Sequence, residues 1–251
     1  MRLRVLGCHG GELPKHKTTC FLLDEKLVLD AGALTSSLPL EALCQIDDII
    51  LSHSHFDHVK DLPLLADLVM GIRRSPIRVH ASKECIATLR THMFNDFLWP
   101  DFTRIPSEEA PIIQVEPFEA GSSFKIGEYH IQSIPVSHPV ESCGFVVTRG
   151  GVSVAMSGDT GPTEELWRVL NRTTNLKAIL LETSFPNRLQ PLAEVSGHLT
   201  PGLLKIELDK LTLKGAQILL YHLKPAYVSE LKRELKGMPV EVLELGDTFE
   251  F

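Results

Sequence analysis

The spacing of hydrophobic residues predicts a chain built from short strands and amphipathic helices. In the first third, four apolar runs indicate strands and two stretches with helical spacing indicate helices. The strands fall at residues 20–23, 27–29, 49–51 and 77–79, and the helices at 62–72 and 82–93. A polar turn, Asp24-Glu25-Lys26, separates the first two strands and predicts a hairpin, and Ser82 is the expected N-cap of the second helix.

The rest of the chain continues this alternation. We expect strands at 124–126, 129–134, 144–147, 152–156, 178–181, 217–221 and 240–243, and helices at 163–170, from 200 onward and at 228–236. Thr200-Pro201 has the cap and first-turn chemistry of a helix start, and Gly237 is typical of a helix end. Strand-rich halves that each end in helices predict an α/β protein with two packed sheets and helices outside.

Composition narrows the class of protein. The 251 residues are 43% hydrophobic and 23% charged, which allows a sizeable core and argues against a disordered chain. A formal net charge of −7 disfavours a broad cationic face for nucleic acid or anionic membrane. No secretory signal and no apolar run of about 18 residues is visible, so we expect no membrane association and a cytoplasmic location. The five scattered cysteines lack a C-x-x-C pair and are expected to be reduced and mostly buried.

One short segment has an unusual density of metal-binding side chains. The sequence His53-Ser54-His55-Phe56-Asp57-His58 places four strong ligands within six positions, which has a chance probability on the order of 0.1%. The segment lies between a predicted strand and a predicted helix, so its side chains belong to a strand-end loop. In an extended segment His53 and His55 point to the same side, whereas adjacent residues do not. The segment is therefore expected to serve two ions.

Three further candidate ligands occupy similar places. His138, Asp159 and His222 each follow a predicted strand. A lone histidine or aspartate after a strand is more often a hydrogen-bonded turn residue, but loops at strand ends often converge to build a site. Together with the six-residue segment they indicate one metal site. Imidazole and carboxylate ligands suit zinc, and a site without thiolate also accepts manganese or iron.

This ordered set of residues resembles the metallo-β-lactamase superfamily, and nearly the whole chain resembles its class II 3′,5′-cyclic nucleotide phosphodiesterases. The shared segments are residues 92–101, 158–162, 182–185, 197–201 and 222–225. Two positions depart from that family: Phe56, where a smaller aliphatic residue is expected, and Cys8-His9, where small residues are more usual. The resemblance implies a metallo-β-lactamase-like αββα sandwich, with two packed mixed β-sheets and helices on their outer faces, formed by one domain over residues 1–251.

The resemblance also implies an assignment of ligands. One divalent ion would be held by His53, His55 and His138, the other by Asp57, His58 and His222, and Asp159 would bridge them. Zn²⁺ is the first expectation for both ions, with Mn²⁺ or Fe²⁺ as alternatives. The implied reaction is hydrolysis of 3′,5′-cyclic nucleotides, cAMP or cGMP, to 5′-monophosphates by a hydroxide that bridges the two metals. Asp57 is then a candidate catalytic residue as well as a ligand.

Four more residues are candidates around this centre. His198 is the candidate acid for the leaving O3′, with a surface or capping role as the alternative. Glu182 either orients His198 or a ligand, or ends a strand in solvent. Asn95 and Trp99 are candidates for binding the base, by hydrogen bonding and by stacking, and the aromatic residues of their segment are equally compatible with the core.

Other classes of function stay open. A tRNA 3′-processing endonuclease of the same superfamily shares the ligand set, but the net charge of −7 disfavours RNA as a partner. Hydrolysis of another ester or a thioester is compatible with the same ligands. A non-catalytic metal- or nucleotide-binding protein would be expected to have lost a ligand, and none of the seven positions is lost. The sequence does not decide between a monomer and a homodimer.

Overall fold

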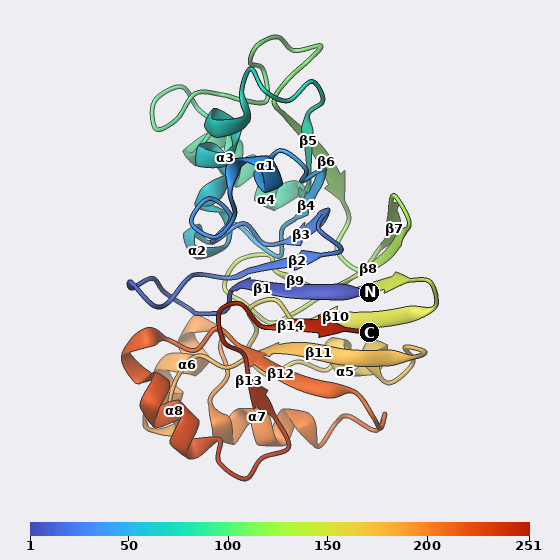
Figure 1. Ribbon diagram of the computed structural model, residues 1–251. Helices are drawn as coiled ribbons and strands as arrows, with labels where there is room; N and C mark the ends of the chain where they lie inside the picture. Colours follow the sequence, from blue (N-terminus) through green and yellow to red (C-terminus); the bar gives the residue numbers. More distant parts are fainter.

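The computed structural model describes residues 1–251 and contains two seven-stranded β-sheets (Figure 1). The first sheet has the strand order β14-β1-β2-β3-β4-β5-β6. Its strands are β1 (Arg2–Gly7), β2 (Cys20–Leu23), β3 (Leu27–Leu29), β4 (Asp48–Ile50), β5 (Ile77–Ser82), β6 (Ile113–Phe118) and β14 (Thr248–Glu250). Pairing is antiparallel from β14 to β3, with the predicted hairpin of β2 and β3, and parallel from β3 to β6.

The second sheet is also mixed and has the order β13-β12-β11-β10-β9-β8-β7. Its strands are β7 (Ser123–Ile126), β8 (Tyr129–Pro135), β9 (Cys143–Arg149), β10 (Val152–Met156), β11 (Leu176–Glu182), β12 (Gln217–Tyr221) and β13 (Glu241–Val242). Pairing is antiparallel from β7 to β10 and parallel from β10 to β13. The loops after β8, β10 and β12 therefore leave the sheet at the same end of the strands, because these three strands run in the same direction.

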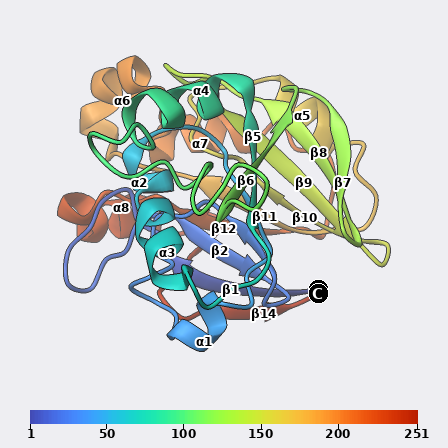
Figure 2. The same cartoon turned by 90° about the horizontal axis from the view of Figure 1, so that it is seen from above.

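The helices lie on the outer sides of the two sheets (Figures 1 and 2). The first sheet carries α1 (Leu40–Leu43), α2 (Phe56–Val59), α3 (Asp61–Val69) and α4 (Lys83–His92). The second carries α5 (Glu165–Leu170), α6 (Gln190–Ser196), α7 (Pro201–Leu208) and α8 (Val228–Glu234), with short 3₁₀ turns at Asn187–Leu189 and Pro225–Tyr227. The predicted αββα layers are confirmed.

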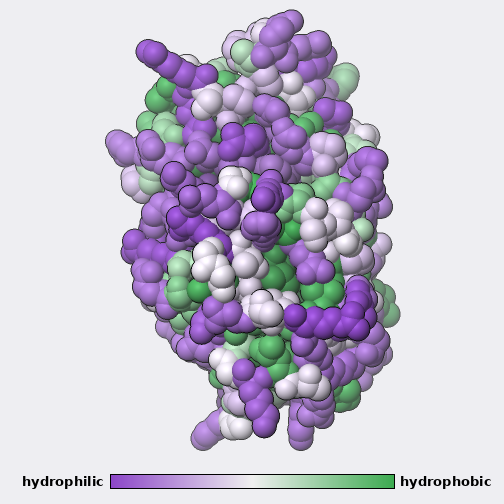
Figure 3. Space-filling model, turned by 90° about the vertical axis from the view of Figure 1, so that its right-hand side faces the viewer, coloured by the Kyte–Doolittle hydropathy of each residue, from purple (hydrophilic) through white to green (hydrophobic).

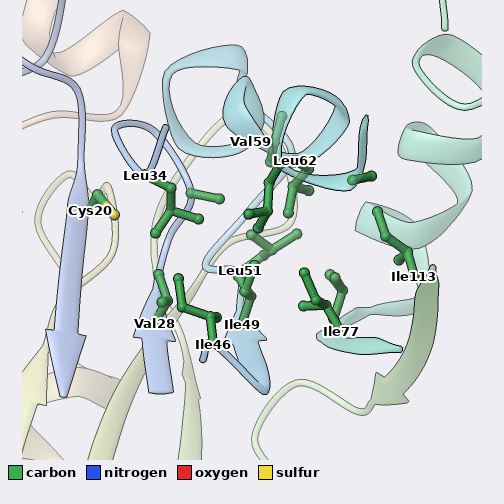
Figure 4. Close-up of a cluster of buried hydrophobic side chains, with 14 of the residues drawn as sticks. Cys20, Val28, Leu34, Ile46, Ile49, Leu51, Val59, Leu62, Ile77 and Ile113 are labelled. Atoms are coloured by element: carbon green, nitrogen blue, oxygen red, sulfur yellow. The ribbon is translucent and has the colours of Figure 1, made fainter. Parts of the chain in front are cut away.

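Three clusters of buried apolar side chains hold these layers together. One lies under α1–α4, where Val28 and Ile49 of the strands meet Val59 and Leu62 of the helices (Figure 4). The second joins the two sheets, and the third packs the second sheet against α5, α7 and α8. The surface view in Figure 3 is largely hydrophilic, with apolar residues gathered near its middle. No helix combines the length and apolar character that crossing a bilayer requires.

Some predicted boundaries are wrong. The helix expected to reach residue 72 ends at Val69, because Met70 leaves the helical path with a ψ of 132° and Gly71 follows with a positive φ of 76°. The helix expected from residue 163 begins at Glu165. Strand β6, the short helices α1 and α6, and strand β14 were not predicted. Both predicted caps are present, since the side chains of Ser82 and Thr200 accept hydrogen bonds from backbone amides of α4 and α7. Four of the five cysteines are buried, as expected.

Candidate metal centre

The seven predicted ligands converge where the two sheets meet. The segment from His53 to His58 follows β4 of the first sheet, and the other three ligands follow β8, β10 and β12 of the second. His53, His58, Asp159 and His222 are at most 1% exposed. The remaining three are only partly buried and form the open side of the cluster; they are His55, Asp57 and His138.

The segment from 53 to 58 begins extended and then turns into a helix. The rings of His53 and His55 lie together as the alternation predicts, with centroids 4.7 Å apart. Helix α2 starts at Phe56, so the chain does not stay extended, and its first turn brings the ring of His58 to 4.2 Å from that of His53. An extended segment that turns directly into a helix is therefore what gathers four ligands from six residues.

The ligand atoms form two groups that share one carboxylate. The donor atoms of His53, His55 and His138 lie within 4.8 Å of one another, and so do those of Asp57, His58 and His222. Oδ2 of Asp159 lies 3.8 Å from Nε2 of His53. The same oxygen lies 3.3 Å from Nε2 of His58 and 3.2 Å from Nε2 of His222. The structure thus brings all seven residues together.

Hydrogen bonds on the far side of the rings set the direction of four histidines. His138 donates from Nδ1 to the carbonyl of Gly197 at 2.9 Å, and His222 donates from Nδ1 to Oγ of Ser184 at 2.8 Å. His53 and His58 also use Nδ1, with the hydroxyl of Ser52 and the carboxylate of Asp30 as their respective partners. A histidine that donates from Nδ1 keeps the Nε2 lone pair free for a metal. These rings are therefore arranged as ligands are in metal centres.

Two buried atoms of the cluster lack any hydrogen-bond partner. They are Nε2 of His53 and Oδ1 of Asp159. Leaving a buried polar atom unpaired costs about 1–3 kcal/mol, so such atoms require an explanation. A divalent cation between the two sheets would bind both atoms. The donor set, which contains nitrogen and oxygen but no thiolate, suits zinc, manganese or iron.

Burial and neighbouring charges favour the metal-binding protonation state at three of the ligands, His53, Asp57 and Asp159. Burial lowers the pKa of His53 well below its usual value, which keeps the ring neutral. Burial opposes the charge on Asp159, but His222 and His58 more than offset it and hold the pKa of Asp159 well below its usual value. The pKa of Asp57 is lowered in the same way, against burial, by the adjacent rings of His222 and His58. At His58 burial opposes the charge, but Asp159 and Asp30 more than offset it and raise the pKa well above its usual value, so a cation would displace a proton there. Neutral imidazole beside ionised carboxylate is the form that a metal requires.

Asp30 supports this centre and is not among the residues predicted from the sequence. It is fully buried directly after β3, and its carboxylate accepts hydrogen bonds from Nδ1 of His58 at 2.7 Å and from Oγ of Ser52 at 2.8 Å. The same hydroxyl lies 2.9 Å from Nδ1 of His53. Asp30 therefore orients two ligands, one directly and one through Ser52. Its position after a strand that pairs with β4 is the signal that could have identified it.

His198 and Glu182 form a buried pair beside the cluster. His198 is 6% exposed, and its Nδ1 donates to Oε1 of Glu182 at 2.9 Å. Its ring lies 5.2 Å from that of His138 and 5.3 Å from that of His222. Burial opposes a charge on His198, but the carboxylate of Glu182 more than offsets it and raises the pKa of His198. The surface alternatives for both residues are therefore wrong.

Asn95 and Trp99 lie on the loop after α4, outside the cluster. The side chain of Asn95 donates to the carbonyl of Thr91 and accepts from the amides of Phe97 and Leu98. Trp99 is partly buried and packs against the core under α1–α4. The polar atoms of Asn95 are thus used within its own loop, and no contact joins either residue to the metal ligands.

The chain is similar to known proteins both in sequence and in structure. A 3′,5′-cyclic-nucleotide phosphodiesterase described as probable, from Yersinia pestis, is 26% identical over 255 residues, covering 82% of this chain and 68% of that protein. Unliganded yeast PDE1 superposes with a TM-score of 0.82 at 19% identity, covering 100% and 99% of the two chains. The short form of human tRNase Z superposes with a TM-score of 0.73 at 17% identity, covering 100% and 99%.

The fold is the metallo-β-lactamase fold, and the site gathers candidate ligands for metal ions. The family model of the β-lactamase superfamily domain matches residues 28–222, which include all seven predicted ligands. The chain belongs to this superfamily.

Proposed function

We propose that the protein is a dinuclear-metal phosphodiesterase that hydrolyses 3′,5′-cyclic nucleotides, cAMP or cGMP, to 5′-monophosphates in the cytoplasm. The observation that carries this proposal is the pair of ligand groups that share Asp159. The names of relatives such as the Yersinia protein support a cyclic nucleotide as the substrate. Zn²⁺ is the proposed metal at both positions, with Mn²⁺ or Fe²⁺ as the alternatives.

The ligands are assigned as two triads and a bridge. His53, His55 and His138 would hold one ion, Asp57, His58 and His222 would hold the other, and Asp159 would serve both. When bound, two divalent cations acidify water and neutralise charge on a phosphodiester. Asp57 lies on the open side with 27% of its side chain exposed, so its carboxylate can accept a hydrogen bond from the attacking water.

His198 is the proposed acid for the leaving O3′. Glu182 holds Nδ1 of the ring, so Nε2 is left to donate a proton to the alkoxide oxygen. Glu182 is itself fixed by amide hydrogen bonds from Thr160 and Leu199 at 3.2 Å and 3.3 Å. The donor atoms of His198, Asp159 and His222 also lie within 4.8 Å of one another, which makes His198 an alternative ligand. Metal content of the variant His198→Ala distinguishes the roles: an acid loses turnover and keeps the metal.

For the base, we propose the loop that carries Asn95 and Trp99. Asn95 contributes by shaping the loop, since its amide bonds to the backbone at Thr91, Phe97 and Leu98. Trp99 supports the loop from the core side. The side chains that this loop presents to the nucleotide are considered below.

The decisive experiment is an assay of purified protein whose metal content has been measured. The substrates are cAMP, cGMP, a linear phosphodiester, a thioester and unprocessed tRNA. We expect the protein to hydrolyse a cyclic nucleotide and to contain about two metal ions per chain. A chelator should abolish this turnover, and added divalent metal should restore it. Cleavage of tRNA or of the thioester without hydrolysis of either cyclic nucleotide would assign the site to another reaction of the superfamily.

A further inference from the structure

A small apolar hollow lies between α2, α4 and the loop that follows α4. Its volume is about 110 Å³, and its floor consists of Val59, Leu89 and Met93. Phe56 and Leu98 form two of its walls. None of the residues around it is an aspartate, glutamate, lysine or arginine. The hollow therefore favours an uncharged apolar group over a phosphate.

The hollow borders the open side of the metal centre. Phe56 lies between the ligands His55 and Asp57 in the chain, so its Cα is about 3.8 Å from each of theirs. Those two ligands are among the three that are partly exposed. Ser54, on the other side of His55, also lines the hollow. A molecule whose phosphate reaches the metal ligands can thus place a neighbouring group against Phe56.

The exposed apolar residues at this hollow are held in place. Phe56 is 67% exposed and Leu98 is 63% exposed, although contact with water is unfavourable for both. Leu98 is fixed because its amide donates to Oδ1 of Asn95 at 2.8 Å. The side chain of Asp96 further ties the loop by accepting from the amide of Asp101 and from Arg104. Exposed apolar side chains that a helix and an ordered loop present to one hollow are typical of a ligand contact.

We propose that the base of the nucleotide stacks on Phe56 and packs against Leu98. This inference rests on the proposed function and adds the residues that recognise the base. A nucleobase is planar, uncharged and able to stack, which matches an aromatic wall in a hollow that no aspartate, glutamate, lysine or arginine lines. Stacking of a base on an aromatic side chain contributes about 1–3 kcal/mol. Phe56 and Leu98 then replace Trp99 as the contact residues of the base.

The test compares substrates with and without a base on metal-loaded protein. For Phe56→Ala we expect the KM for cAMP to rise about tenfold while kcat changes by less than about twofold. Hydrolysis of ribose 3′,5′-cyclic phosphate, which lacks the base, should be unchanged, and Phe56→Tyr should restore the KM for cAMP. Leu98→Ala, which is distant in sequence from the ligands, should raise the same KM. The matched control is Leu68→Ala on α3, an exposed leucine outside the hollow.

Two results would overturn the inference. One is a KM for cAMP that neither substitution changes, and the other is an equal loss on the base-free substrate. If the wild-type protein hydrolyses neither cyclic phosphate, the proposed function fails, and saturation-transfer NMR with 5′-AMP then decides the base site separately. The site is supported if the adenine protons of 5′-AMP are saturated by the wild-type protein and not by Phe56→Ala. Absence of adenine saturation in the wild-type protein contradicts it.

Discussion

Replacement of Asp30 by asparagine should weaken metal binding while leaving the fold intact. Asp30 adopts a positive φ of 59°, a conformation that asparagine tolerates, so the backbone can keep its path. The carboxylate accepts three hydrogen bonds, from the amide and the hydroxyl of Ser52 and from Nδ1 of His58. An amide offers only one oxygen, so one of these buried donors must face an NH₂ group. Where the NH₂ group faces His58, the ring proton moves to Nε2, which then cannot bind a metal.

The size of the effect follows from the number of ligands that Asp30 controls. Loss of a carboxylate that orients a metal-binding histidine typically costs about 10- to 100-fold in metal affinity. Asp30 acts on His58 directly and on His53 through Ser52, and these residues belong to different ligand triads. We therefore expect both ions to bind more weakly in Asp30→Asn, each by about 10- to 100-fold.

A competition titration against a chromophoric zinc chelator measures this change for the wild-type protein and the variant. Asp48→Asn is the matched control, because Asp48 is also a buried aspartate bonded to a histidine, His80, at 2.8 Å, but belongs to neither triad. The control should keep wild-type zinc affinity. Circular dichroism confirms that each variant is folded. A folded Asp30→Asn protein with a zinc Kd within about twofold of the wild-type value would refute the reasoning.

Three further outcomes are expected. Asp48→Asn should lower the free energy of unfolding by about 2 kcal/mol, because Arg78 and His80 lose a charged acceptor. Although burial opposes its charge, these hydrogen bonds lower the pKa of Asp48, so the stabilisation is present at neutral pH and is lost as the carboxyl becomes protonated. The free energies of unfolding of the two proteins, measured with urea, should therefore converge as the pH falls below the usual pKa of an aspartate, about 3.9. Iodoacetamide should label the native protein mainly at Cys44, the one cysteine that is not buried, as measured by intact-mass analysis. Burial raises the pKa of Cys8 and of Cys143 to about 12, so rapid labelling of these two thiols would contradict the structure. Glu182→Gln should lower kcat for cAMP by about 100-fold, because His198 loses the carboxylate that orients it. Since Glu182 acts through His198, the single variant His198→Ala should be no more active than the double variant that carries both substitutions.

The parts of the site that could be predicted from the sequence are those with a local signal. The segment from His53 to His58 is dense enough in ligands to identify itself, and His138 and Asp159 follow strands with clear apolar runs. The position of Asp30 beside Ser52 depends instead on the pairing of Leu29 with Ile50. Such a contact between separate segments leaves no trace in local periodicity. Phe56 and Leu98 meet at the hollow for the same kind of reason.

The fold shows the same division. Helices with caps, such as the one that Ser82 begins, were located, since the cap and the periodicity agree. Strand β6 was missed, because Pro117 lies within it and proline is unfavourable inside a strand. Its six-residue pairing with β5 supplies what the local sequence lacks. Helix α6 is short and has one buried residue, Ala193, so it gives almost no hydrophobic pattern.

The proposed ligands lie on both sheets, so a bound cation would be a cross-link between the two halves of the sandwich. His53 and His58 come from the first half, Asp159 and His222 from the second, and the peptide between them is about a hundred residues long. Any ion that bridges them ties these halves at the seam. At about a thousand times its Kd, such an ion adds about 4 kcal/mol to the stability of the folded chain. Supply of metal in the cell would then regulate the lifetime of this protein as well as its chemistry.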